Sequence, residues 1–563
     1  MREVIVIRTQ SAERSLARPQ RQGIPSKTLF FLILALAVGL YFRFTHLDAQ
    51  VYWHDEAYTS LRISGYSAAE VNRRLFTGEV TTPGDLLAYQ RVVPGTSIVD
   101  TVQSLALEDS QHPPLYYGLA RLWAERFGAS VATVRSLSVW LSLLLFPGVY
   151  WLCQELFYVP HPEQRGRSFA TLTATLAIAL IAVSPFHLLY AQEAREYGLW
   201  SALITLSSAA WLRGLRCHTG WSWATFTLLL VLTLYTHPLT LFLVVVYGVH
   251  GLLLWQHCSR RTLAAGFGAL AVSVLAYWPW LQIIVANWSK TGATWTSVPL
   301  PLPILLKTWG LHWARAFWMP EGDFGFDDWR VYLGLPLIVG LGCIAFYRLY
   351  RQTPLRTWAL VLLLTGSTVV PLGLMDLVMG GQRSVSSRYV LPFYVGLPIA
   401  IAYFFATQFS VLHRDHRSRF SRQVGRGVAV VLLAFSVICC AANANADTAW
   451  PKGINYNLPT VARLINQAER PLLVSHSFGI NFGTLLALSH RLEPDTQLQL
   501  VNGWAAPETI EAPTLPSHTQ PIFLLNPNDL FRHQIEAQQH QKATLVFQDT
   551  HLFLWKLDNQ SKK

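Results

Sequence analysis

Ionisable residues follow three apolar segments of this chain within a few positions. Asp55 and Glu56 stand in WHDEAY after the first segment, Arg195 stands in QEAREY after the third, and Arg388 follows a later one. A carboxylate at the floor of a cavity could act as a general base. The forked donors of a guanidinium fit phosphate oxygens. These residue types therefore suggest a proton acceptor and a phosphate clamp.

Each of these residues also has a structural interpretation. The acidic pair could cap the helix that follows it. The two arginines, each close to a tyrosine, could instead be snorkelling cations beside aromatic anchors at a membrane interface. Because Asp55 and Glu56 are adjacent, their side chains diverge by about 100° on a helix, and only one readily points into a given cavity. The sequence leaves open which of the two does so.

Two histidines stand beside prolines at similar positions. His237 precedes Pro238 after the fifth apolar segment, and it could be a satisfied interfacial histidine, a metal ligand or a phosphate partner. His112 opens HPPLYY, where the prolines predict a rigid entry into a helix. Their positions, rather than their residue type, make both histidines candidates.

The composition indicates a membrane protein. Of the 563 residues, 52% are hydrophobic and only 13% are charged, about half the roughly 25% usual for soluble domains. These figures exclude a disordered chain, a collagen-like repeat and a small disulfide scaffold. The net charge of +12 comes from arginine clusters between apolar runs, without a basic stripe, which argues against nucleic-acid binding. The six cysteines show no CxxC spacing, so a zinc or iron–sulfur site is not expected.

Apolar stretches near the length of a bilayer predict about eleven membrane-spanning helices. The first follows a basic leader in residues 1–27; a cleaved signal peptide is the alternative, but no small-x-small site follows Phe42. The predicted spans are 28–47, 132–154, 168–188, 197–213, 221–236, 238–257, 262–285, 331–350, 356–378, 389–411 and 427–443.

The positive-inside rule orients these spans. With a cytoplasmic N-terminus, the arginine-rich loops all lie inside and the long segments 48–131, 286–330 and 444–563 lie outside a cytoplasmic membrane. The ionisable motifs then all face outward. Their common face was not assumed in the assignment, because only the arginines of the inner loops set the orientation. Ionisable residues at membrane depth are costly, so this clustering on one face marks a candidate site.

The outer segments predict further structure. In Pro114–Gly128, apolar residues share a face away from Arg121, Glu125 and Arg126, which predicts a helix on the membrane surface. From about 444 onward, short β-like runs alternate with helical ones, without a GxGxxG or GxxxxGKS motif. We therefore expect an all-α polytopic membrane domain over 28–443 and a small α/β extracytoplasmic domain over 444–563.

The order of the motifs resembles glycosyltransferase family 39, the group of protein O-mannosyltransferases and aminoarabinose transferases with the GT-C fold. The matching segments are Asp55-Glu56, HPPLYY at 112–117, VRSLS at 134–138, AREY at 194–197, Thr236-His237 and RYVLP at 388–392. The resemblance implies a polyprenyl-phosphate sugar as donor, inverting transfer outside the cytoplasmic membrane, contact with membrane lipids, and a divalent metal such as Mg, Mn or Zn. The tail after 444 does not look like the sugar-binding repeats of the eukaryotic mannosyltransferases, so protein O-mannosylation does not follow.

Within this family chemistry, the candidate residues take expected roles. A carboxylate must take the proton of a hydroxyl acceptor, and we choose Asp55, with Glu56 as the alternative. Cationic donors stabilise the phosphate leaving group. The remaining expectations are Arg195, Tyr197, Arg388 and Lys290 for the donor phosphate, His237, Glu108 and Asp109 for a metal or phosphate, and His54, His112 and Tyr116 for the acceptor.

Two other functions fit charged residues in a polytopic protein. A transporter or lipid flippase is the main alternative, and a non-catalytic envelope scaffold is another. Transporter sites usually lie near the bilayer midplane on broken helices of repeated halves. The charges here follow the outer ends of the spans and the halves do not match, which favours the transferase.

Overall fold

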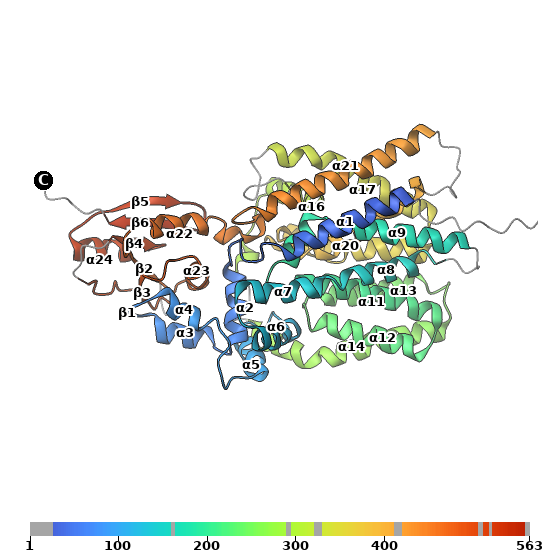
Figure 1. Ribbon diagram of the computed structural model, residues 1–563. Coiled ribbons are helices and arrows are strands. Elements are labelled where there is room, and N and C mark those ends of the chain that lie inside the picture. The colour runs from blue at the N-terminus through green and yellow to red at the C-terminus, as the bar shows by residue number, and fades with distance from the viewer. Residues whose placement is uncertain are drawn as a thin grey trace, which may run out of the picture.

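The computed structural model describes residues 26–158, 164–288, 294–319, 329–409, 419–504, 510–516 and 521–557. It consists of a long helical bundle and a smaller domain built around a β-sheet, with a group of short helices between them (Figure 1). Lys290, expected at the donor phosphate, lies outside the described residues.

The bundle corresponds to the predicted spans, each of which matches one helix or a pair of consecutive helices. Its helices are α1 (Ser26–Phe44), α7 (Val131–Ser142), α8 (Leu145–Leu156), α9 (Gln164–Ala182), α10 (Pro185–Ala191), α11 (Tyr197–Cys217), α12 (Gly220–Leu234), α13 (Thr240–Leu253), α14 (Arg260–Ala286), α16 (Leu302–Arg315), α17 (Trp329–Gln352), α18 (Leu355–Gly366), α19 (Val369–Met379), α20 (Leu391–Phe409) and α21 (Arg419–Ala444). The helix α16 lies within the second predicted outer segment.

Length and composition support membrane crossing. Among the described residues, five helices are long and apolar enough to span a membrane, or up to seven if each of two bent pairs forms one span. The pairs are α9 with α10, bent by 66°, and α18 with α19, bent by 43°. The segments Leu29–Phe44, α12 and α13 are shorter apolar helices. This is a polytopic membrane protein.

Burial distinguishes central from peripheral helices. Nearly every residue of α11 and α20 is buried, and these two helices contact each other. In contrast, α14 exposes large apolar side chains such as Leu275 and Val285, and α17 exposes Tyr347. An apolar rim around a buried centre suits contact with lipid.

The first outer segment folds into short elements between the bundle and the sheet. They are α2 (His54–Ser64), α3 (Ala68–Leu75), β1 (Thr77–Thr81), α4 (Pro83–Ala88), α5 (Ile98–Glu108) and α6 (Pro114–Phe127). The prediction of a helix beginning at Pro114 is confirmed, but its expected polar face is partly wrong. Arg121 is buried and donates hydrogen bonds to the carbonyl oxygens of Ile63 and Thr96. The α6 helix therefore holds the α2–α5 region together.

The C-terminal domain contains the predicted alternation of strands and helices. Its elements are α22 (Leu458–Asn466), β2 (Leu472–His476), α23 (Asn481–Leu488), β3 (Gln497–Val501), β4 (Ile522–Leu525), α24 (Asp529–Gln539), β5 (Ala543–Gln548) and β6 (Phe553–Leu557). The sheet order is β1-β3-β2-β4-β6-β5; β3, β2 and β4 are parallel, and the other pairings are antiparallel. The edge strand β1 comes from the first predicted outer segment and the other strands from the last one, so residues 48–131 and 444–563 contribute to one sheet (Figure 1).

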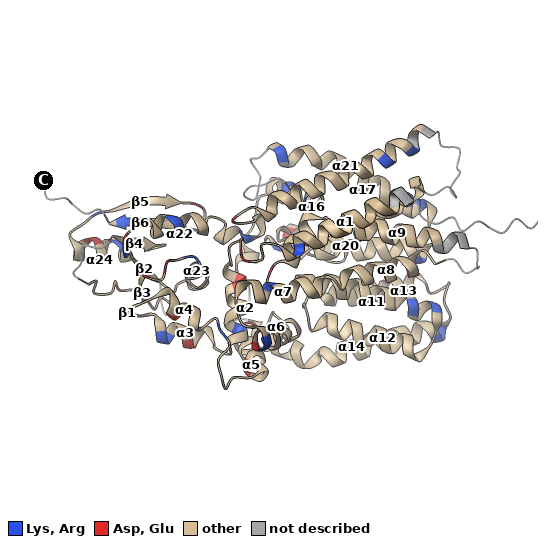
Figure 2. Ribbon diagram, viewed as in Figure 1, with Lys and Arg blue, Asp and Glu red and all other residues tan. Residues whose placement is uncertain are grey.

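Charge is distributed unevenly along the molecule. Figure 2 shows a group of basic residues at the end of the bundle far from the sheet, whereas the sheet domain and the region of α2, α3 and α5 carry acidic residues together with basic ones. The arginines at the far end include Arg213 and Arg216 on α11, and Arg260 and Arg261 on α14. This is the asymmetry that the positive-inside rule uses.

Candidate active site

The candidate site lies at the start of α2, where the bundle meets the sheet domain. Trp53 has extended backbone dihedral angles, and the Glu56 carboxylate reaches back toward its N–H at 3.5 Å, which is the acidic half of a capping box at the first turn. The structural interpretation of the acidic pair therefore holds for Glu56. The helix places the neighbouring Asp55 carboxylate in a different direction.

Glu56 lies in a buried cluster of charges. Its carboxylate accepts hydrogen bonds from Arg135 Nε at 2.7 Å and Nη2 at 2.6 Å, from Lys452 Nζ at 2.9 Å and from the backbone N–H of Ala194 at 2.8 Å. Burial alone would raise the pKa of Glu56, but Arg135 and Lys452 outweigh it and lower the pKa to about 2. Since both carboxylate oxygens are already engaged, Glu56 is poorly placed to accept another proton.

Asp55 is the more accessible carboxylate. Arg388 Nη1 lies 2.5 Å from its Oδ2, and the two side chains are 17% and 18% exposed. Burial opposes the charged carboxylate, but Arg388 and then Arg195 outweigh it and hold the pKa of Asp55 below its ordinary value. Asp55 is therefore an ionised carboxylate next to a guanidinium at the edge of the site.

Arg195 also contacts Asp55, through the backbone of that residue. Its Nη1 donates to the carbonyl oxygen of Asp55 at 3.2 Å and to Thr59 Oγ1 at 3.3 Å. Its Nη2 contacts the His112 ring, whose Nδ1 lies 3.1 Å from the buried carboxylate of Glu196. Burial disfavours the charged form of Glu196, but Arg195 and His112 outweigh it and keep its pKa low. This acidic partner orients Arg195 and balances its charge.

Aromatic rings line the same region. The Trp200 and His237 rings stack 4.1 Å apart, and the His237 and Tyr389 rings lie 6.4 Å apart. Burial lowers the pKa of His237 to about 3, so the imidazole is neutral near pH 7. Tyr197 is buried with its ring 5.9 Å from the Arg195 guanidinium. These rings form a low-dielectric wall around the two arginines.

Other predicted residues lie elsewhere or make different contacts. Glu108 and Asp109 both pair with the buried Arg62 and hold α5 against α2. Tyr116 is buried and its hydroxyl lies 2.7 Å from Ser138 Oγ. His54 lies beside Asp55, packs against α23 and has a buried Nδ1 without a hydrogen-bond partner. Of this group, His54 alone is adjacent to the Asp55–Arg388 pair.

Sequence reasoning assigned no role to four residues that build the site. Arg135 belongs to the quoted segment VRSLS, and Glu193 and Glu196 belong to the segment QEAREY, so a motif signal was present for these three. Lys452 stands in the C-terminal segment without such a signal. Its buried ammonium contacts Glu56, and this contact in the folded protein identifies Lys452 as a site residue.

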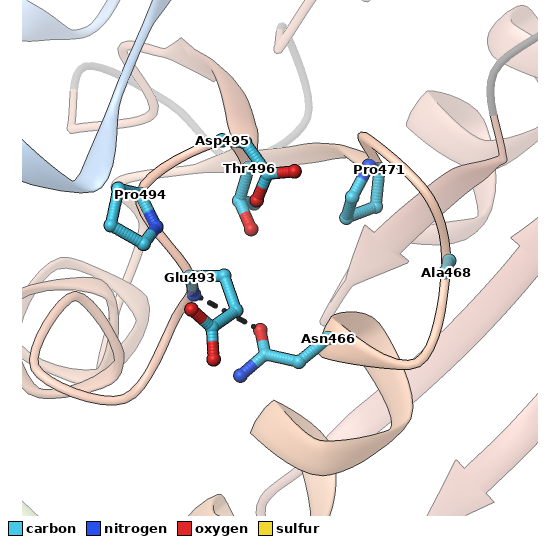
Figure 3. Close-up of a pocket in the computed structure, with 7 residues that line it drawn as sticks. All are labelled: Asn466, Ala468, Pro471, Glu493, Pro494, Asp495 and Thr496. Atoms are coloured by element: carbon cyan, nitrogen blue, oxygen red, sulfur yellow. Dashed lines mark hydrogen bonds between the residues drawn. The ribbon is translucent and has the colours of Figure 1, made fainter.

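Two cavities lie away from this cluster. One of about 400 Å³ lies in the sheet domain, at the amino ends of β2 and β3 (Figure 3); Glu493 donates its backbone N–H to Asn466 Oδ1 across one side. It is lined by Asn466, Ala468, Pro471, Glu493, Pro494, Asp495 and Thr496. The other, of about 410 Å³, is mainly apolar and lies between α17, α20 and α21. Neither cavity contains a residue of the Asp55 region.

The residues do not fit the divalent metal that the family resemblance implies. Within the described ranges, no three or more His, Cys, Asp or Glu side chains gather as a potential ligand set. Asp55 and Glu56 instead face cationic side chains. A metal requirement stays a prediction of the resemblance.

Comparison with known proteins gives a match only at the level of structure. No protein-family profile and no curated protein sequence matches the chain. The crystal structure of ArnT from Cupriavidus metallidurans bound to undecaprenyl phosphate is 14% identical, covers 94% of this chain and 98% of its own, and has a TM-score of 0.50. The apo oligosaccharyltransferase of Archaeoglobus fulgidus is 13% identical with the same TM-score, and the match covers 85% of this chain and 65% of that one.

Identities this low show the fold alone. Both structures are GT-C glycosyltransferases, and the match to ArnT extends over the bundle and the C-terminal domain. Membership of family 39 stays a prediction. The chain has the GT-C membrane fold with a small C-terminal sheet domain.

Proposed function

We propose that this protein is an inverting glycosyltransferase that moves a sugar from a polyprenyl-phosphate donor to a hydroxyl acceptor outside the cytoplasmic membrane. The observation that carries the proposal is the pairing of Asp55 with Arg388, with Arg195 alongside, at one end of a GT-C bundle. The structural match to a protein crystallised with undecaprenyl phosphate supports the choice of donor class.

Asp55 is the general base of the proposed reaction. The acceptor hydroxyl oxygen attacks the anomeric carbon from the face opposite the phosphate, and its proton passes to the Asp55 carboxylate. The bond between the anomeric carbon and the phosphate oxygen breaks, and its electron pair leaves with the polyprenyl phosphate. A single displacement of this kind inverts the anomeric configuration.

The two arginines stabilise the leaving phosphate. A phosphate is already a stable anion, so it needs charge neutralisation more than a general acid. Arg388 and Arg195 flank Asp55 and provide forked donors in a buried setting, where such hydrogen bonds are stronger than in water. His112 and Glu196 hold Arg195 in its orientation.

Arg388 links donor binding to the strength of the base. Without donor it pairs with Asp55 and lowers the proton affinity of the carboxylate. An arriving phosphate draws the guanidinium toward itself and adds negative charge, and both effects raise the pKa of Asp55. The base is then strongest when the donor is in place.

The transporter or flippase alternative has less support. The charged residues gather where the bundle meets the sheet domain, following the ends of α1, α10 and α19. A site at the end of the bundle suits a donor whose prenyl chain stays in the membrane while its phosphate and sugar lie outside. The proposed location is the cytoplasmic membrane, with the sheet domain on its outer face.

Reconstitution tests the proposal directly. Purified protein in proteoliposomes, supplied with radiolabelled polyprenyl-phosphate sugars and envelope extract, is expected to transfer label to an acceptor. Lipid-sugar translocation across the same vesicles without covalent transfer would instead establish the flippase. Glycolipid and glycoprotein profiles of a deletion strain identify both substrates through accumulated donor and missing product.

A further inference from the structure

The parallel strands of the C-terminal sheet end beside α2. In open α/β sheets, ligands bind outside the carboxyl ends of the strands, at the point where the strand order reverses. Here β2 leads through α23 to β3 on one side, and the chain then returns across β2 to β4 on the other. The reversal lies between β2 and β4, next to His476 and Asn526.

Two exposed aromatic rings occupy this carboxyl edge. Phe478 follows β2 and is 44% exposed, and Trp504 follows β3 and is 43% exposed. The Trp504 indole N–H donates to the carbonyl oxygen of Ser477 at 3.0 Å, and the Gly503 N–H donates to Ser477 Oγ at 2.9 Å. The two loops are thus tied together, which fixes Trp504 before any ligand arrives.

A buried polar atom without a partner lies at the same edge, beside a buried histidine. His476 is 3% exposed; its Nδ1 accepts the Phe478 N–H at 3.3 Å, and its ring also hydrogen-bonds to the backbone of Asn526. Asn72 from α3 is 4% exposed; its Nδ2 donates to Asn502 Oδ1 at 2.9 Å, and its Oδ1 has no partner. Such atoms are costly unless a ligand or water satisfies them.

A row of rings connects this edge to the candidate active site. The ring centroids of His54 and Tyr58 lie 4.9 Å apart, those of Tyr58 and Phe482 lie 5.8 Å apart, and those of Phe482 and Trp504 lie 5.4 Å apart. A side chain at Gly483 would collide with His54, so α23 packs tightly on α2. This packing fixes Trp504 and α23 relative to the helix that carries Asp55.

We propose that the carboxyl edge formed by Phe478, Trp504, His476 and Asn72 binds a saccharide, and that this saccharide is part of the acceptor. Sugar rings present apolar C–H faces that stack on aromatic rings and hydroxyl groups that both donate and accept hydrogen bonds. The exposed rings supply the first surface, while Asn72 Oδ1 supplies an unused acceptor next to the His476 ring. The role of the saccharide as acceptor rests on the proposed function.

The uncharged character of these groups favours a neutral polyhydroxylated ligand. Burial lowers the pKa of His476 to about 4, so its ring is neutral near pH 7. The other three residues carry no charge. A phosphate or an ionic peptide would need opposite charges, which the four proposed residues do not provide.

The test uses the full chain in nanodiscs and saturation-transfer NMR with methyl glycosides of mannose, glucose, galactose and arabinose at millimolar concentration. We expect at least one glycoside to bind. Trp504→Ala and Phe478→Ala should each weaken its binding about two- to tenfold, the range of one aromatic stacking contact. Trp504→Tyr, which keeps a ring, should retain most of the binding.

The controls separate this surface from the catalytic residues. Trp221→Ala removes an exposed Trp from the start of α12 and should leave binding unchanged. Asp55→Asn should also leave it unchanged. Absence of binding by all four glycosides, or binding that persists in both aromatic variants, would overturn the proposal. Binding at Trp504 in a protein that transfers no sugar would refute the proposed transferase function and leave the saccharide surface standing.

Discussion

Lys452 and Glu56 are 396 positions apart in the chain, and the Nζ of Lys452 lies 2.9 Å from Oε2 of Glu56 inside the protein. Arg135 of α7 binds the same carboxylate. The first turn of α2 is thereby fixed from the bundle and from the C-terminal segment together. Glu56 positions the helix, and its neighbour Asp55 is left to face the site.

This relationship predicts a strong effect of Glu56 on folding. Glu56→Gln leaves two buried cations without their counter-charge, and breaking a buried pair typically costs about 3–5 kcal/mol. We expect a clearly lower unfolding temperature for Glu56→Gln in nanodiscs. Arg463→Met, which breaks an exposed pair with Asp447, serves as the control and should change little. A Glu56→Gln protein of normal stability that binds donor but transfers no sugar would make Glu56 the base.

Asp55→Asn should abolish most catalysis without loss of folding. The amide keeps the size of the side chain but cannot accept a proton, so transfer should fall by roughly 10²–10⁴-fold. Donor binding should survive, since Arg388 loses a competing anion. Single-turnover transfer and donor binding on the same purified protein check both expectations. Near-normal turnover would remove Asp55 from the mechanism.

Arg388→Lys and Arg195→Lys should impair use of the donor. Lysine keeps the charge but loses the forked donor geometry that fits phosphate oxygens. Arg383→Lys is a matched control, because Arg383 lies in the same loop with 18% exposure but pairs with Asp376 instead of Asp55. Donor KM and kcat should change in the first two variants and stay normal in the third. Unchanged values in all three would favour the membrane-anchor interpretation.

Local sequence patterns predicted the secondary structure well. The apolar spans and the C-terminal strands were found because each leaves a periodic signal within a few residues. The strand β1 was missed because Thr77–Thr81 is short and pairs with β3 more than 400 positions away. Arg121 was placed on a solvated face because helical periodicity does not reveal that backbone carbonyl oxygens from two other segments satisfy it.

The site residues also fall into those that local motifs predicted and those that only distant contacts reveal. Motifs located Asp55, Arg195, His112 and Arg388, which the structure brings together. The different environments of Asp55 and Glu56 depend on Arg135 and Lys452, which approach from distant parts of the chain. Such pairings leave no local pattern, so sequence alone could not assign the two carboxylates.

The membrane topology predicts opposite compartments for two positions. Gln423 lies at the start of α21, and Gln541 follows α24 in the sheet domain. Reporter fusions at these positions should give a cytoplasmic signal at Gln423 and an outer signal at Gln541. The same compartment at both would place the arginine-rich loops on the wrong side and overturn the orientation.

Glu193 should make stability depend on pH in a defined window. It is buried, with Oε1 accepting the Trp53 indole N–H at 3.1 Å. Burial, assisted by the neighbouring Glu56 and Asp55, raises the pKa of Glu193 to about 7 against the opposing effects of Lys452 and Arg388. The ordinary pKa of a glutamate in the unfolded chain is about 4.3. Between about pH 4.3 and pH 7, the folded state therefore binds a proton at Glu193 that the unfolded chain has lost.

The stability contributed by the neutral Glu193 is therefore complete below about pH 4.3 and is lost as the pH rises toward 7. Glu193→Gln mimics the neutral form, so it should unfold at a temperature similar to wild type at pH 4 and at a higher one at pH 8. Buried histidines also titrate as the chain unfolds, so the difference between variant and wild type is the quantity to measure. Glu79→Gln, at an exposed position of β1, should show no such difference. A difference for Glu193→Gln that stays constant from pH 4 to pH 8 would mean that Glu193 is ionised throughout, held as a carboxylate by Lys452.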